Sequence, residues 1–380
     1  MYTVQKEKNY AACQYVDKTC LFLVQYALPI LLLCGCRFAQ RSAQCGDHER
    51  TNARKFGAPR HEYAEGSVSF AFQGGEPTLA GLDFFKRHVE LCKRYAKTGV
   101  QICNSLQTNG FAIDEEWAQF FAENHFLIGL SLDGPKELHD LFRKDSQGQG
   151  TFHRVRQTVT LFERYKAEYN ILCVVTEEVA KNANKVMNFF INNGFSYLQF
   201  IPCLDGLEGE KGEWSLSAER YGEFLVTSFK KYYSCFLKKK FLSIRNFDNY
   251  LSLLAGYPAE HCGMNGRCTA YFVVEGNGDV YPCDFYVLDK YKGGNVNENS
   301  LREIQKSEVF KKFVEESLPV AEECKECKCF LLCRGGCRRY REPFEKGTPS
   351  LNVYCESYKK FFEECGEELL KVVKELLKKA

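Results

Sequence analysis

Cysteines concentrated between residues 262 and 355 constrain this chain more than any other feature. Nine of its twenty cysteines lie there, at Cys262, Cys268, Cys283, Cys324, Cys327, Cys329, Cys333, Cys337 and Cys355. Several spacings are short enough for one loop to bring a group of thiolates onto one metal ion or one iron-sulfur cluster. Eight of the nine would fill two four-ligand sites and leave one cysteine spare.

Two other uses of these cysteines have to be weighed. A disulfide framework normally belongs to a small secreted domain, whereas this chain has 380 residues, 45% of them hydrophobic. Structural zinc is the stronger alternative, because Cys324-x2-Cys327 followed by Cys333-x3-Cys337 is compatible with a short zinc ribbon. The spacing alone leaves zinc and iron-sulfur open. Many cysteines without a convincing signal peptide predict a cytoplasmic, reducing location.

Charge and hydropathy exclude some partners. The formal net charge is +2 and 26% of the residues are charged, so composition shows no bias toward nucleic acid or membrane. The apolar run at 21–36 is too short to span a bilayer and contains Gln25 and Pro29. It follows neither the period of a strand nor that of a helix, so we expect no regular element from it.

From residue 67 onward the pattern becomes orderly. Strands are expected at 68–72, 101–106, 126–132, 169–175 and 197–202, and helices at 82–95, 115–124, 151–165 and 180–193. This alternation predicts an α/β fold with a parallel sheet and helical crossovers, in which the loops after the strands carry the chemistry. Further helices are expected at 224–247, between the two halves, and at 358–379.

The loop after the first of these strands reads Gln73-Gly-Gly-Glu-Pro77. Gly74 and Gly75 let the backbone approach a ligand closely, and Glu76 before Pro77 offers a carboxylate at a fixed angle. A plain tight turn is the alternative use of a Gly-Gly pair.

Four motifs together resemble one family. They are Gln73-Gly-Gly-Glu-Pro-Thr-Leu-Ala-Gly81, Gln107-Thr-Asn-Gly110, Ser131-Leu-Asp-Gly-Pro135 with His139, Asp140 and Arg143, and Gln199-Phe-Ile-Pro-Cys-Leu204. With the cysteine region, they are similar to the anaerobic sulfatase-maturating enzymes from about residue 65 to the end. The resemblance implies a radical S-adenosylmethionine enzyme with a partial (β/α)6 barrel, followed by a SPASM domain with two auxiliary 4Fe-4S clusters. Such enzymes oxidise a Cys or Ser of a sulfatase to Cα-formylglycine.

The resemblance also assigns site residues. The first auxiliary cluster would be held by Cys262, Cys268, Cys283 and Cys337, and the second by Cys324, Cys327, Cys333 and Cys355, with Cys329 spare. S-adenosylmethionine would be bound by Gly74, Gly75, Glu76, Ser131, Arg143 and Leu204. Gln73 would lie near the substrate peptide, and Asp284 would be the base that takes the target's proton, with a solvated surface Asp as the alternative.

The implied domains and partners complete this interpretation. We expect an irregular segment at 1–63, a partial barrel at 64–240, a SPASM domain at 241–360 and a final helix at 361–380. The expected partners are a sulfatase polypeptide and an electron donor such as flavodoxin or ferredoxin, with neither nucleic acid nor membrane.

One departure from the family is decisive. The cluster that cleaves S-adenosylmethionine needs Cys-x3-Cys-x2-Cys, and no such triplet stands before Gly74. Codons compatible with residues 24–34 can spell this motif when read one base later, because Val24-Gln25, Leu28-Pro29 and Leu31-Leu32 permit shifted Cys codons at the required spacing. We therefore hypothesise that about residues 14–60 are translated out of frame, which would leave the written chain inactive.

Three functions remain open on the sequence. The first is a sulfatase-maturating enzyme that is competent once the frame is restored. The second is another SPASM peptide maturase that forms crosslinks, which the Gln73 loop and the strand before Leu204 disfavour. The third is a non-catalytic iron-sulfur or zinc protein, which the literal sequence supports.

Overall fold

A computed structural model describes residues 21–25, 67–96, 98–207, 211–345 and 347–378. Its centre is a sheet in which six consecutive strands run parallel. These strands are β2 (Ser67–Gln73), β3 (Gln101–Thr108), β4 (Phe126–Ser131), β5 (Glu168–Val175), β6 (Tyr197–Pro202) and β7 (Ser243–Ile244). The expected α/β fold is confirmed.

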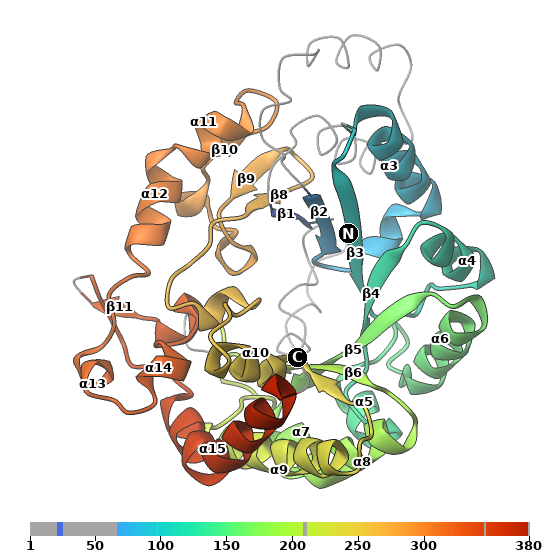
Figure 1. The fold of residues 1–380 in the computed structure, drawn as a ribbon. Helices are drawn as coiled ribbons and strands as arrows, with labels where there is room; N and C mark the ends of the chain where they lie inside the picture. The colour runs from blue at the N-terminus through green and yellow to red at the C-terminus, as the bar shows by residue number, and fades with distance from the viewer. Residues whose placement is uncertain (1–20, 26–66, 97, 208–210, 346, 379–380) are drawn as a thin grey trace, which may run out of the picture.

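Helices connect these strands and cover the outer face of the sheet (Figure 1). They are α3 (Leu82–Tyr95), α4 (Glu115–Glu123), α5 (Lys136–Phe142), α6 (Phe152–Tyr165), α7 (Glu177–Lys181), α8 (Ala183–Asn192) and α9 (Ala218–Leu237), with a short 3-10 turn, η1, at Pro77–Ala80. The parallel strands followed by helices form the partial barrel that the resemblance implies.

Alternation along the strands separates the core from the inner face of the barrel. In β2, Val68, Phe70 and Phe72 are buried, and the Phe72 ring packs edge-on against Phe84 and Phe85 of α3. Because successive side chains of a strand point to opposite faces, Gln73 lies on the face turned away from α3. A polar residue at the end of β2 is thereby directed to the inside of the barrel.

The cysteine-rich half occupies the left of Figure 1, in yellow to red. Its helices are α10 (Arg245–Leu254), α11 (Leu301–Gln305), α12 (Glu308–Glu315), α13 (Glu322–Lys325), α14 (Phe330–Cys333) and α15 (Cys355–Leu377). Its strands are β8 (Phe272–Val274), β9 (Asp279–Tyr281), β10 (Gly294–Asn295), β11 (Phe344–Glu345) and β12 (Thr348–Pro349). Short 3-10 turns are η2 (Cys262–Met264), η3 (Asp284–Tyr286), η4 (Asp289–Tyr291) and η5 (Arg338–Arg341). The last helix, α15, returns to pack on α9.

The strand β1 (Leu21–Gln25) joins the two halves of the sheet. It pairs antiparallel with β2 on one side and with β8 on the other. The expectation that the apolar run at 21–36 forms no regular element is therefore wrong for its first five residues. The rest of that run lies outside the described residues. Strand β1 runs antiparallel to β2, whereas the strand that would open a complete (β/α) barrel would run parallel to it.

Two helix predictions need correction. The helix expected at 180–193 is two helices, because the Asn182 side chain bonds to the Glu178 carbonyl and ends α7 before α8 begins. The helix expected at 224–247 stops at Leu237, and Lys239 then adopts a left-handed φ of 55°. The chain re-enters the sheet as β7, just past the expected domain boundary at residue 240. No helix within the described ranges is long and apolar enough to cross a bilayer.

Candidate active site

A hydrogen bond joins the two halves of the molecule at the predicted site. The Gln73 Nε2 atom, at the end of β2, donates to the Asp284 Oδ2 atom at 2.9 Å. Asp284 opens η3 immediately after Cys283, whose thiol donates to the other carboxylate oxygen at 3.4 Å. Three residues that the sequence interpretation assigned to substrate, base and cluster are therefore in direct contact.

The environment of Asp284 favours a carboxyl that can exchange a proton. Burial raises the pKa of the Asp284 carboxyl above its usual range, and the hydrogen bonds from Cys283 and Gln73 act in the opposite direction. A carboxylate whose pKa is raised is a better proton acceptor than a solvated surface Asp. The partly buried position of Asp284 also disagrees with the alternative of a solvated surface residue.

The loop after β2 has the backbone form expected of it. Gly74 and Gly75 adopt φ angles of 90° and 52°, in the left-handed region that glycine tolerates best. The Glu76 carboxylate accepts hydrogen bonds from the Thr108 hydroxyl and the Asn109 amide, both at 2.7 Å, and it also caps η1. Glu76 thus ties the β2 loop to the loop after β3.

The predicted cofactor residue Arg143 is held by a partner that the sequence interpretation did not name. Its Nε and Nη2 atoms both donate to the Asp133 carboxylate, the second at 3.2 Å. Asp133 is 4% exposed and also accepts from the Val174 amide at 2.8 Å. It stands two residues after Ser131, inside the Ser-Leu-Asp-Gly motif, so the motif itself was the available signal.

The two remaining residues predicted to contact S-adenosylmethionine also follow strands of the barrel. Ser131 is the last residue of β4 and is 6% exposed. Leu204 stands two residues after β6 and is half-buried. With the Gln73 and Glu76 loop, these side chains all lie at the carboxyl ends of parallel strands, where such folds place their sites.

The first predicted thiol set is brought together by short turns. Cys262 begins η2, Cys283 and Cys337 precede η3 and η5, and the Cys268 amide donates to the Ser317 hydroxyl at 2.8 Å. Burial and, to a smaller extent, the neighbouring thiols of Cys262 and Cys268 raise the pKa of the Cys337 thiol to about 12. Mutual effects of this kind require the thiols to be neighbours.

The second predicted set lines a small cavity. The lining residues are Cys324, Cys327, Cys329, Phe330, Cys333, Cys355, Tyr358 and Lys359. Burial raises the pKa of Cys333 to about 12, and Cys355, Cys324 and Cys327 add to this effect. Cys329 lines the same cavity, and after burial Cys327 is the one predicted ligand that raises the pKa of Cys329, as it is for Cys324. The choice of Cys329 as the spare thiol therefore stays a prediction.

Each predicted set supplies four cysteine thiols, the donor type and number that a 4Fe-4S cluster takes. Within the described part of the chain, no three Cys, His, Asp or Glu side chains converge on one point as the ligands of one metal ion do. A zinc ion would need four thiolates about 2.3 Å from a common centre. Iron-sulfur clusters are likewise held by four cysteine thiolates, but on separate iron atoms. The donor sets therefore fit 4Fe-4S clusters.

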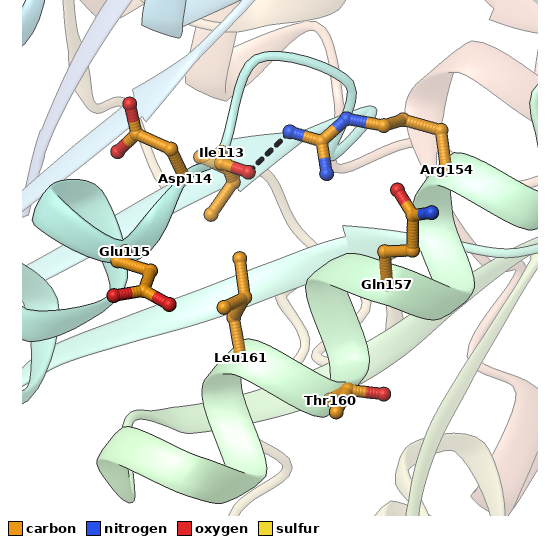
Figure 2. A pocket seen from close by; sticks show the side chains of 7 residues that line it. All are labelled: Ile113, Asp114, Glu115, Arg154, Gln157, Thr160 and Leu161. Carbon is orange, nitrogen blue, oxygen red and sulfur yellow. Dashed lines mark hydrogen bonds between the residues drawn. The ribbon is translucent and has the colours of Figure 1, made fainter.

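A larger pocket lies elsewhere and holds none of these residues. Figure 2 shows it between α4 and α6, where Arg154 donates to the carbonyl of Ile113 and the side chain of Leu161 forms part of the wall. It contains no predicted site residue, so it does not belong to the candidate site.

The frame hypothesis concerns about residues 14–60. Apart from β1, these residues lie outside the part of the chain that the structure describes.

Comparison with known proteins gives consistent matches. A family profile described as an iron-sulfur cluster-binding SPASM domain matches residues 262–328, and one described as the radical SAM superfamily matches residues 36–190. A cysteine-type anaerobic sulfatase-maturating enzyme of Clostridium perfringens (strain 13 / Type A) is 50% identical over 311 residues, 81% of this chain and 84% of the relative. A serine-type enzyme of Bacteroides thetaiotaomicron is 35% identical over 330 residues, 82% of this chain and 78% of the relative.

A solved structure supports the same assignment. "Native anSMEcpe with bound AdoMet and Cp18Cys peptide" has a TM-score of 0.80 and 50% identity, covering 82% of this chain and 87% of that one. Because the match covers most of both chains, it includes the barrel as well as the cysteine-rich half. The chain therefore belongs to the anaerobic sulfatase-maturating enzymes, which are radical S-adenosylmethionine proteins with an iron-sulfur SPASM domain.

Proposed function

We propose that this protein oxidises one cysteine of a sulfatase polypeptide to Cα-formylglycine. The cysteine target is favoured over serine because cysteine-type relatives are 45–50% identical, whereas the serine-type relative of Bacteroides thetaiotaomicron is 35% identical. The observation that carries the proposal is the hydrogen bond between Gln73 and Asp284, because it builds one site from a barrel strand and a SPASM turn.

The chain's own residues take defined roles in this reaction. When bound, S-adenosylmethionine and a reduced 4Fe-4S cluster supply the radical that removes a hydrogen atom from the target Cβ. Asp284 accepts the proton of the target thiol, and Gln73 orients the Asp284 carboxylate beside the peptide. The thiols of the first set, Cys262, Cys268, Cys283 and Cys337, and of the second, Cys324, Cys327, Cys333 and Cys355, would hold the two auxiliary clusters, one of which would accept the second electron of this two-electron oxidation. Water would then replace the sulfur of the oxidised residue, which would leave as hydrogen sulfide.

The cofactor is held at the carboxyl ends of the strands. Its binding residues are Gly74, Gly75, Glu76, Ser131, Arg143 and Leu204. The hydrogen bonds of Glu76 to the β3 loop, and of Asp133 to Arg143, preorganise this edge of the sheet. An electron donor such as flavodoxin or ferredoxin would supply the reducing electron, in the cytoplasm.

Replacing Asp284 by Asn tests the proposal, in a chain whose Cys-x3-Cys-x2-Cys frame has been restored. Loss of a general base typically slows a reaction about 10²–10⁴-fold, so formylglycine formation on a cysteine peptide should fall by about that factor. Cleavage of S-adenosylmethionine to 5′-deoxyadenosine should persist, because Asp284 acts on the peptide. Mass spectrometry of the peptide and chromatography of the nucleoside separate the two steps.

The matched control is Asp289→Asn, five residues further on and solvent-exposed. It should leave both readouts unchanged. Formylglycine produced at the parental rate by Asp284→Asn would overturn the assignment of the base.

A further inference from the structure

Arg341 is a buried cation whose charge has no carboxylate partner. It ends η5, is 2% exposed, and donates from Nη1 to the Pro319 carbonyl at 2.7 Å and from Nη2 to the Ser317 carbonyl at 2.8 Å. Its Nε atom is buried with no hydrogen-bond partner. Among the described residues, no carboxylate forms an ion pair with it. A buried charge is normally compensated, so something in this environment should carry negative charge.

Arg338, three residues earlier, shows the usual arrangement. Its Nη2 atom bonds to the Glu316 carboxylate at 2.8 Å, and its Nε atom lies 4.0 Å from Glu342. Its guanidinium also stacks over the rings of Phe313 and Tyr286. Two carboxylates therefore lie against Arg338, although its Nε atom is also buried without a hydrogen-bond partner, whereas the two hydrogen bonds of Arg341 go to carbonyls.

The groups beside Arg341 are thiols of the two cluster sites. The Ser317 carbonyl accepts from Arg341, and the Ser317 hydroxyl accepts from the Cys268 amide at 2.8 Å. Burial lowers the pKa of the Arg341 guanidinium, while Cys268 and then Cys337 are the neighbours that raise it most. Arg341 also opposes the effect of burial on the Cys324 thiol of the second set. Through Ser317, the guanidinium is thus linked by two hydrogen bonds to the backbone of Cys268 in the first set.

We propose that Arg341 is the buried counter-charge of the first iron-sulfur site and raises the reduction potential of the cluster held there. This rests on the ligand assignment in the proposed function. Iron is bound by thiolates and not by thiols. When the cluster is bound, the first site therefore carries negative charge that compensates the positive charge of Arg341. Reduction adds one more negative charge. A fixed buried cation linked to the site stabilises the reduced form, because the protein interior screens charges weakly.

The test uses the full chain, reconstituted anaerobically with ferrous iron and sulfide. Iron per chain is measured first, and the midpoint potentials are then measured by redox titration followed by electron paramagnetic resonance. The signal of the first site is the one lost in Cys283→Ser. In the Arg341→Met variant, at a fixed potential, the ratio of the reduced to the oxidised form of the first cluster should fall about tenfold. This fall corresponds to a midpoint potential lower by ~59 mV for a one-electron couple. Arg341→Lys keeps the charge and should shift this ratio much less.

The outcomes separate this proposal from the ligand assignment. If the parent chain binds no cluster, or Cys283→Ser loses no signal, the ligand assignment fails. If Arg341→Met keeps its iron and its potential is unchanged, Arg341 is only a structural anchor and the proposal is overturned. If Arg341→Met binds no cluster, Glu316→Gln on the surface decides. Removing that carboxylate uncovers the charge of Arg338 and should shift the first potential upward, and an unchanged or lower potential contradicts the proposal.

Discussion

Asp133 illustrates how one residue organises the cofactor end of the barrel. It is buried, accepts hydrogen bonds from Arg143 and the Val174 amide, and donates its own amide to the His139 Nδ1 atom at 3.3 Å. Arg143 is the one cation in the described structure that forms an ion pair with Asp133. Removing the arginine would therefore leave a buried carboxylate uncompensated.

Arg143→Gln should lower the free energy of unfolding by ~3–5 kcal/mol, the usual result of breaking a buried ion pair. Urea denaturation followed by circular dichroism measures this change. The double variant Asp133→Asn/Arg143→Gln should recover part of the loss, because the unpaired charge is then gone. A single variant within about 1 kcal/mol of the parent would show that water reaches Asp133.

His139 should make stability depend on pH. Burial lowers its pKa from 6.5 to about 4. Its Nε2 atom lies 3.1 Å from the Thr151 hydroxyl, which itself donates to the Arg143 carbonyl, so the neutral ring must keep Nδ1 as an acceptor for Asp133. A folded pKa below the unfolded one means that the unfolded chain binds more protons. The contribution of His139 is therefore complete above pH 6.5 and is lost as pH falls toward 4.

The slope from this residue is at most about 1.4 kcal/mol per pH unit in that window. His139→Asn retains an acceptor near the position of Nδ1 and cannot be protonated. Its free energy of unfolding should vary less between pH 6.5 and 4 than that of the parent. Equal slopes in urea titrations across this range would count against the role of His139.

At the residue scale, the motifs predicted more of the site residues than of the residues that hold them in place. Gln73 and Asp284 were assigned separately by resemblance, and the structure adds their hydrogen bond across a sequence separation of 211. Thr108 and Asp133 stand inside quoted motifs and Arg341 does not, but none of the three was given a role, because each acts through a hydrogen bond or a charge whose partner is distant or belongs to the backbone. No spacing in the sequence identifies such partners.

At the scale of elements, the contact of α9 with α15 positions the last predicted ligand. Cys355 is the first residue of α15, and two residues later the Ser357 hydroxyl donates to the Ala218 carbonyl of α9. Gly222 in α9 permits this approach, because a Cβ there would lie 3.1 Å from the Ser357 Cα atom. The absence of a side chain at Gly222 therefore sets the distance between the helices.

Gly222→Ala should destabilise the protein by ~1–3 kcal/mol through overpacking, despite the better helix propensity of alanine. It should also reduce the iron bound at the second site, because Cys355 moves with α15. Gly366→Ala is the matched control, since Gly366 lies within α15 and a Cβ there meets nothing within 4 Å. That variant should gain about 1 kcal/mol and retain its iron. Two variants of equal stability and iron content would refute the close-approach argument.

Regular elements were predicted well where one pattern ran from end to end. The helix at 82–95 and the strand at 197–202 have the expected bounds, since each carries an unbroken period. The break after Leu237 was missed, because apolar residues continue at helical spacing while the backbone turns at Lys239. In the cysteine-rich half, two- and three-residue strands are too short for any period to be recognised.

At the scale of the whole molecule, we expect the missing Cys-x3-Cys-x2-Cys to decide activity. The match to the radical SAM family begins at residue 36, after the positions where the shifted frame would place this motif. We expect the written chain to bind at most two clusters and to leave S-adenosylmethionine intact. A chain with the frame restored over about residues 14–60 should bind a third cluster and produce 5′-deoxyadenosine.

Resequencing the gene across the codons for residues 1–67, with iron analysis of both chains, checks this expectation. The relevant control is the restored chain with serine at the three motif positions, which should behave like the written one. Nucleoside cleavage by the written chain would disprove the frame hypothesis.

The order in which the ligands emerge during synthesis follows from the hydrogen bond between Gln73 and Asp284. Domains generally fold as they leave the ribosome, with the amino-terminal part first. The barrel strand that carries Gln73 is made early, but its partner Asp284 comes more than two hundred residues later, and each thiol set closes only with Cys337 or Cys355. A nascent barrel would therefore expose an unfinished inner face for most of translation. If the two thiol sets hold the auxiliary clusters as proposed, iron delivery to these two sites would have to wait for a nearly complete chain.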